Sequence, residues 1–142
     1  MGWMTALISG ALMSIQGVFN TALTKSSSLW TANSFVQFTA WLVCMAAWFF
    51  TGRKSFGSLW QVDNKLMLFG GVIGAFITMT VIKSMADLGP ARSVMLIVVS
   101  QLLVAYVIEL LGIWGVEKQP FELRKAVGMV FAIAGIIIFK WK

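Results

Sequence analysis

The chain has 142 residues, of which 59% are hydrophobic and 11% charged, and its formal net charge is +6. Soluble domains carry about 25% charged residues, so this composition indicates an integral membrane protein. The chain has no histidine and a single cysteine, Cys44, which excludes a disulfide scaffold, a His/Cys metal site and a Ser-His or Cys-His nucleophile pair within one chain. We therefore expect no enzyme, no cofactor and no metal.

Five apolar stretches are candidates to cross a bilayer as helices, which takes about 20 residues each. They run approximately over residues 3–23, 29–50, 66–86, 94–114 and 126–139. We expect one all-α domain, 1–142, built from five transmembrane helices. The fifth stretch has only 14 apolar residues, so its crossing depends on flanking lysines that reach toward the headgroups and on Trp141 as an interfacial anchor.

Breaks between these stretches are readable in chain order. Ser28 is placed to cap the second helix, and the segment Phe56–Trp60 is a small apolar patch suited to the membrane surface. Gly89-Pro90 separates the third and fourth helices, because proline suits the first turn of a helix and glycine the preceding end. The short break predicts a tight antiparallel hairpin.

Basic residues divide almost equally between the two faces that five spans define. One face has six of them and the other has five: Arg53, Lys54, Lys65, Lys118, Arg124 and Lys125 against Lys25, Lys83, Arg92, Lys140 and Lys142. Orientation is normally set by an excess of Lys and Arg in short cytoplasmic loops, so the near-balance predicts insertion both ways up. Their scattered placement favours contact with lipid headgroups and argues against a nucleic-acid partner.

Small residues line one face of several predicted helices. The first carries Gly10, Ser14, Gly17 and Thr21, the third Gly70 and Gly74, and the fifth Gly128, Ala132 and Gly135. In lipid, close helix packing relies on such residues. They indicate packing within one protomer, with subunit contacts as the alternative.

Uncharged polar side chains recur at helical spacing inside the apolar stretches. Gln16 and Asn20 lie i,i+4 on the first, Asn33 and Gln37 on the second, and Ser100 and Gln101 near the middle of the fourth. Amides at such depth are costly unless they find partners or water. They either bond helix to helix or line a polar cavity near the midplane that binds a small solute, against which Trp41 is placed to stack.

Glu109 is the one acidic residue well inside a predicted span, six residues before Gly115. Ionisable residues in membranes usually face the interior and mark a pathway, which makes Glu109 a candidate coupling or cation-binding carboxylate. The alternative is a carboxylate that reaches to the interface. Its nearest neighbours by spacing are Ala105 and Tyr106, and Lys83 is no obvious partner.

Several motifs resemble the YdcZ-like family of the drug/metabolite transporter superfamily. Residues 16–23 read QGVFNTAL, which resembles that family's QGxxNxxL signature, and further matches follow in order at 70–75, 88–91, 100–102, 108–112 and 124–128. Glu109 stands where the family often has aspartate. The resemblance covers nearly the whole chain and implies a five-helix subunit that works as an antiparallel pair in a bacterial inner membrane. Such pairs are homodimers, two partners of opposite orientation or one fused chain, and the near-balance of basic residues favours the homodimer.

Three functions fit these features. The favoured one is a dual-topology secondary transporter that moves a small polar or cationic solute by alternating access, as an antiparallel homodimer in contact with membrane lipid. The alternatives are a passive dual-topology channel and a non-transporting assembly subunit. A channel would need a continuous polar row across the membrane, whereas these polar residues gather at particular depths.

Overall fold

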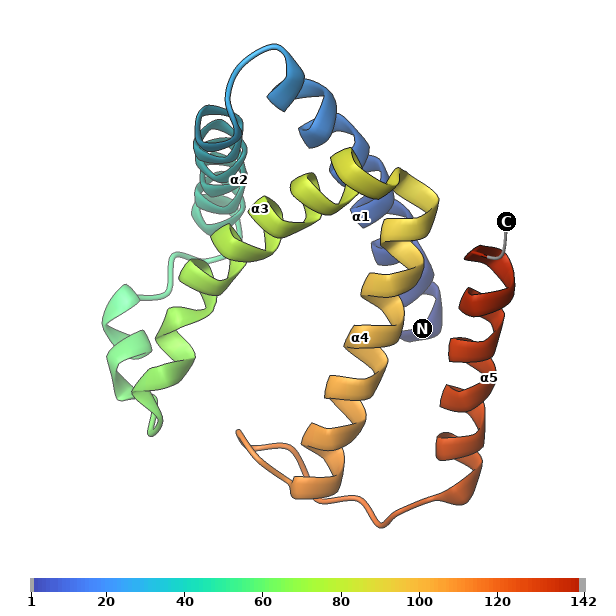
Figure 1. The fold of residues 1–142 in the computed structure, drawn as a ribbon. Coiled ribbons are helices and arrows are strands. Elements are labelled where there is room, and N and C mark those ends of the chain that lie inside the picture. The colour runs from blue at the N-terminus through green and yellow to red at the C-terminus, as the bar shows by residue number, and fades with distance from the viewer. Residues whose placement is uncertain (1, 141–142) are drawn as a thin grey trace. The chain divides into compact units, whose positions relative to one another are not determined.

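The computed structural model describes residues 2–140, and within that range the chain forms α-helices and short 3-10 helices with no strand (Figure 1). The elements are α1 (Gly2–Lys25), α2 (Leu29–Phe50), η1 (Phe56–Gln61), η2 (Lys65–Phe69), α3 (Gly70–Leu88), α4 (Pro90–Leu111) and α5 (Leu123–Lys140). The expected all-helical class is confirmed for these residues. The predicted anchors Trp141 and Lys142 lie outside the described residues.

Four segments in the described range are long and apolar enough to cross a membrane: Gly2–Lys25, Leu29–Phe50, Lys65–Leu88 and Pro90–Leu111. Their large side chains are mostly exposed on the protomer, as with Trp3 at 70% and Phe50 at 84%. Exposed apolar surface of this extent is what lipid contact requires. Helix α5 has 18 residues and is not among the four, so its crossing stays a prediction.

Local sequence signals set several helix ends. Ser28 caps α2, its hydroxyl accepting a hydrogen bond from the Thr31 N–H at 3.2 Å, as predicted. Gly89 precedes α4 with φ of +81°, and Pro90 occupies the first turn, also as predicted. The chain leaves α4 at Gly112, whose φ of +63° ends the helix three residues before the predicted limit at Trp114. The hairpin of the third and fourth helices stays a prediction.

The chain divides into two compact units, Met1–Asp87 and Leu88–Lys142. In the first, Ala32 of α2 and both Ile82 and Met85 of α3 are buried. Helix α1 approaches α3 at Gly17, where a β-carbon would lie 2.5 Å from Met85 Cε. This is one of the predicted small-residue contacts, and it packs two helices of the same protomer.

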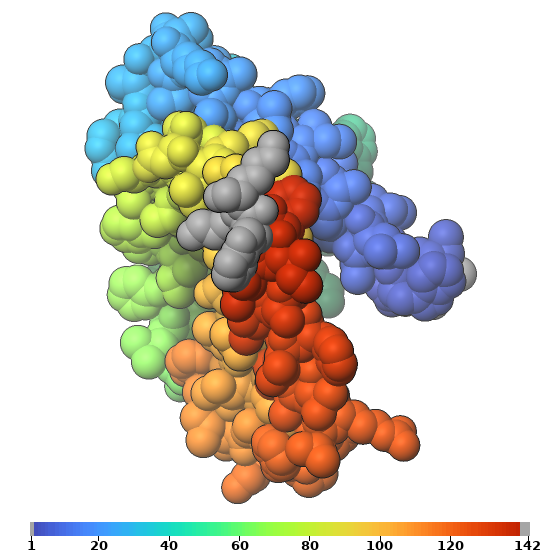
Figure 2. All heavy atoms as spheres, turned by 45° about the vertical axis from the view of Figure 1, so that its right-hand side comes forward, coloured from blue at the N-terminus to red at the C-terminus, as the bar shows by residue number. Residues whose placement is uncertain are grey.

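In the second unit, α4 and α5 lie side by side and antiparallel, joined by the segment 112–122 (Figure 1; Figure 2, orange and red). This segment is tied back to α4 at two points. The Gln119 N–H donates to the Glu109 carbonyl at 2.8 Å, and the Glu122 N–H donates to the Tyr106 hydroxyl at 3.1 Å. These bonds fix the last turns of α4 against the first turn of α5.

Candidate functional site

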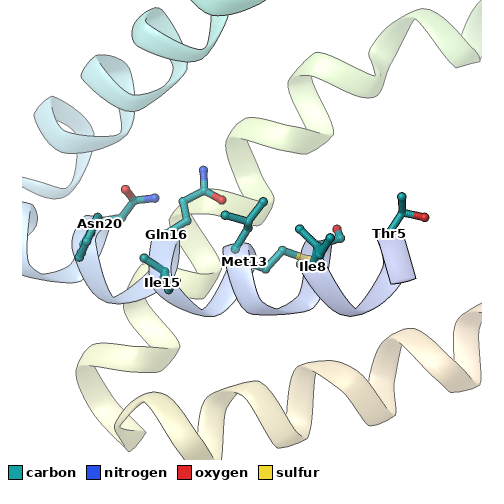
Figure 3. Close-up of a pocket in the computed structure, with 9 residues that line it drawn as sticks. Thr5, Ile8, Met13, Ile15, Gln16 and Asn20 are labelled. Carbon is teal, nitrogen blue, oxygen red and sulfur yellow. The ribbon is translucent and has the colours of Figure 1, made fainter. Parts of the chain in front are cut away.

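The polar residues of α1 share one side of the helix. In Figure 3, Gln16 and Asn20 point the same way from α1, one turn apart. The Asn20 side chain is buried whereas Gln16 is exposed. Both line an open groove of about 510 Å³ along α1, with Thr5, Ile8, Ser9, Leu12, Met13, Ile15 and Phe19. The groove is largely apolar, with amide groups toward one end.

The two amides of α2 are bonded to α3. Asn33 Nδ2 donates to the Ala75 carbonyl at 3.0 Å, and Gln37 Nε2 donates to Thr78 Oγ1 at 3.1 Å. These bonds satisfy one donor of each amide across a helix–helix contact. For these donors, helix packing therefore accounts for the polar spacing seen in the sequence.

Asn33 also carries an unused acceptor. Its side chain is buried, and Oδ1 makes no hydrogen bond within the described residues. A backbone carbonyl oxygen can only accept a hydrogen bond, so the amide atom that faces the Ala75 carbonyl is Nδ2. A buried acceptor without a partner is costly, so Asn33 Oδ1 is suited to a donor from a solute or a water molecule.

The remaining predicted site residues are Trp41, Ser100 and Gln101, and each is exposed on its own helix. Trp41, one turn after Gln37 on α2, is 56% exposed, and its ring stacks on Phe38 with the centroids 6.2 Å apart. Ser100 and Gln101 are exposed on α4, in the second unit. The grouping of Ser100 and Gln101 with the amides of α1 and α2 stays a prediction.

Glu109 lies in the last turn of α4, nearer the helix end than the sequence suggested. Its Oε2 atom is 3.2 Å from Lys125 Nζ, and the same ammonium is 3.6 Å from Glu122 Oε1. The hydrogen bond to Glu109 raises the pKa of Lys125 above 10.5, and the charges of both carboxylates act in the same direction. Lys125 precedes the apolar part of α5. Because its pKa is above 10.5, it is cationic at neutral pH.

Sequence reasoning missed this partner. Glu109 is in the last turn of α4 and Lys125 in the first turn of α5, and an antiparallel helix pair places those turns at the same level. The order of the predicted spans already contained this information. The fourth and fifth spans are joined by one loop, which contains Pro120, so the end of the fourth and the start of the fifth lie at the same membrane face. Spacing along the chain predicts only same-helix neighbours for Glu109, namely Ala105 and Tyr106, and it gives Lys83 as no obvious partner.

A second groove of about 490 Å³ opens beside this ion pair. It is lined by Leu102, Ala105, Tyr106, Glu109, Lys125, Gly128 and Met129. Its wall is mostly apolar, and its charged groups lie together. Its polar groups can form hydrogen bonds and ion pairs. Within residues 2–140 there is no cluster of three His, Cys, Asp or Glu side chains able to hold a metal ion.

A protein-family model described as "Putative inner membrane exporter, YdcZ" matches residues 1–138. The chain belongs to this family. The YdcZ match covers the first helical unit, most of the second and all the predicted site residues, and its description agrees with a multi-pass inner-membrane transporter. No curated protein and no solved structure matches the chain.

Proposed function

We propose that this YdcZ-family chain is a secondary transporter that exports a small polar or cationic solute across a bacterial inner membrane by alternating access. The observation that carries the proposal is the match of residues 1–138 to a family described as inner-membrane exporters. Four helices of membrane-crossing length support a multi-pass subunit. A subunit of this size is suited to assembly with a second copy.

The working unit that we propose is an antiparallel homodimer. The near-equal distribution of basic residues supports insertion in both orientations. Gln16 and Gln101 are exposed on apolar helices of the protomer, where bare contact with hydrocarbon would be costly. A second subunit would cover these two side chains, or a water-filled cavity between subunits would hydrate them. Two opposed copies would also form the inverted repeat on which many transporters are built.

The solute site that we propose contains Gln16, Asn20, Asn33, Gln37, Trp41, Ser100 and Gln101. The buried, unpartnered Asn33 Oδ1 supports this proposal, because it calls for a donor. A solute with N–H or O–H groups would supply one. We propose Glu109 as the coupling carboxylate, acting by exchange of its Lys125 partner for a cation.

A passive channel is the second candidate function. It would share the dimer but not the saturable site, and its flux would rise in proportion to solute concentration. The buried Asn33 Oδ1, which has no partner within the described residues, favours a discrete site. A non-transporting assembly subunit would give no flux at all.

The deciding experiment is flux into proteoliposomes that contain the purified protein. Ethidium, tetraphenylphosphonium and a panel of small polar metabolites serve as probes, with and without an imposed proton gradient. Saturable flux that follows the gradient is expected for a transporter, and linear flux would indicate a channel. Empty liposomes and liposomes with heat-denatured protein are the controls. Absence of flux for every probe under all gradients would count against both functions.

The coupling role has its own test in the same vesicles. Glu109→Gln keeps the shape of the side chain and removes its charge. We expect gradient-driven flux to fall while facilitated exchange persists. If the variant transports normally with an unchanged pH profile, Glu109 is an interfacial ion-pair partner and has no coupling role.

A further inference from the structure

The chain holds one of its own cations in an arrangement typical of a cation-binding site. Lys125 Nζ lies 3.2 Å from Glu109 Oε2, 3.6 Å from Glu122 Oε1 and 5.9 Å from the centroid of the Tyr106 ring. Carboxylates and an aromatic face are the groups that bind organic ammonium ions. Lys125 therefore occupies the position of a ligand.

The Tyr106 ring and the backbone of both glutamates are held in place independently of Lys125. Tyr106 is 7% exposed, and its hydroxyl accepts the Glu122 N–H. The Glu109 backbone carbonyl accepts the Gln119 N–H. The Tyr106 ring and the backbone of both glutamates would therefore keep their approximate positions if the ammonium moved away, and the two carboxylates would stay within reach of the same space.

The cluster has more negative than positive charge. One ammonium faces two carboxylates, and the three side chains are 39%, 41% and 48% exposed. Ion pairs at such exposure are weak, because water and side-chain entropy compete with them. A second cation could therefore displace Lys125 without a large cost.

The groove beside the cluster has room for an apolar body. Leu102, Ala105 and Met129 form part of its wall, and a β-carbon on Gly128 would meet nothing within 4 Å. Its volume of about 490 Å³ is within the range of small-molecule sites. A cation that carries hydrocarbon groups would fit both the apolar wall and the charged cluster.

We propose that the α4–α5 groove binds an amphipathic organic cation, for which the Lys125 ammonium is a tethered competitor. The proposal rests on the proposed transport function for its biological meaning. It specifies amphipathic ions as the cationic class of solute and places their binding in a groove whose lining includes none of the residues proposed above for the polar solute. Glu109, Glu122 and Tyr106 bind the cationic centre, and Leu102, Ala105, Gly128 and Met129 contact its apolar groups. Lys125 swings toward water when the ligand enters and returns when it leaves.

The test is equilibrium binding of tetraphenylphosphonium to the purified protein in phosphatidylcholine nanodiscs, followed by calorimetry. Lys125→Met removes the competing charge at similar length, and we expect it to lower the Kd about fivefold. Glu109→Gln should raise the Kd by about the same factor. The neutral analogue triphenylphosphine oxide should show neither change. Weaker tetraphenylphosphonium binding by Lys125→Met would overturn the proposal, and so would unchanged binding.

A steric variant keeps the test decisive if a charge variant fails to fold. Gly128→Leu fills the groove without altering charge and should abolish probe binding. Gly135→Leu is the matched control, because Gly135 is on the same helix, has open space around its Cβ position and does not line the groove. Equal probe binding by both leucine variants would contradict the site.

The binding and flux experiments together distinguish a failure of the proposed groove site from a failure of the proposed transport function. If the variants change tetraphenylphosphonium affinity as expected but no probe crosses proteoliposomes, the groove stands as a binding site and the transport function falls. If flux is saturable but the Kd does not respond to Lys125→Met or Gly128→Leu, the proposed transporter stands and the groove is not its cation site.

Discussion

Gly17 of α1 faces Met85 of α3 so closely that a β-carbon on Gly17 would lie 2.5 Å from Met85 Cε and 3.3 Å from Val81 Cγ1. The Met85 side chain is flexible at its end, so alanine at position 17 requires only its displacement. A β-branched residue would have to push α3 away. We expect Gly17→Val to destabilise the protein by about 1–3 kcal/mol, seen as a lower melting temperature in detergent.

The control for this substitution is Gly10→Val, which makes the same change in helix propensity on the same helix. No atom lies within 4 Å of the β-carbon position at Gly10, so its melting temperature should stay near that of the wild type. Met85→Ala in the Gly17→Val background should restore part of the loss. Equal destabilisation by both valine variants would show that packing on α3 is not the cause.

The Gln37–Thr78 hydrogen bond should contribute a measurable coupling between α2 and α3. A double-mutant cycle with Gln37→Leu and Thr78→Val should give about 0.6 kcal/mol, the usual size for such bonds in membrane proteins. Thr80→Val is the matched control, because the Thr80 hydroxyl donates only to carbonyls of its own helix. Coupling of Gln37 to position 80 as strong as to position 78 would contradict a direct bond.

Local features of this fold were predictable from sequence, whereas the partners in most contacts between helices were not. The bounds of α2 and the Ser28 cap follow from a polar turn and an apolar run, both local signals. The end of α4 differs from prediction because Gly112 adopts a positive φ that hydropathy does not register. The donors of Asn33 and Gln37 were open to two interpretations, since spacing gives no information on which way a helix is rotated toward its neighbour.

The Glu109–Lys125 ion pair is a second contact between helices that was not predicted from the sequence. Each residue was singled out in the sequence, one as an intramembrane acid and one as a flanking base. Their contact depends on α4 and α5 lying antiparallel and side by side, which is a property of the loop between them. The resemblance to the YdcZ family was predicted from ordered motifs and is confirmed by the match over residues 1–138.

Solute transport should depend on the two amides of α1. We expect Gln16→Ala together with Asn20→Ala to lower flux in proteoliposomes at least about tenfold, because lost hydrogen bonds leave solute groups unpaired. Ser14→Ala is the control, since the Ser14 hydroxyl donates to the Gly10 carbonyl of its own helix. Undiminished flux in the double variant would remove these amides from the proposed site.

If the protein inserts in both orientations, a given loop position lies outside in some molecules and inside in the others. Single cysteines at Ser26 and at Ser55, in a Cys44→Ala background, should each react in part with an impermeant reagent added from outside. Two or three lysines added to the segment 115–125 should shift the population to one orientation. Strictly one-sided labelling of both positions would contradict insertion in both orientations.

The ion pair between α4 and α5 should be lost at alkaline pH, when Lys125 loses its proton. Because its pKa is raised above 10.5 in the folded protein, its stabilising contribution is complete below that value and is lost as pH rises through the folded pKa. We expect the melting-temperature difference between the wild type and Lys125→Met to be constant between about pH 7 and pH 9 and to shrink in more alkaline solution. Lys54→Met is the control, because within residues 2–140 its ammonium makes no ion pair, and its difference should not vary in this way. A Lys125 contribution that disappears below about pH 9 would mean that the ammonium is not held by Glu109 in solution.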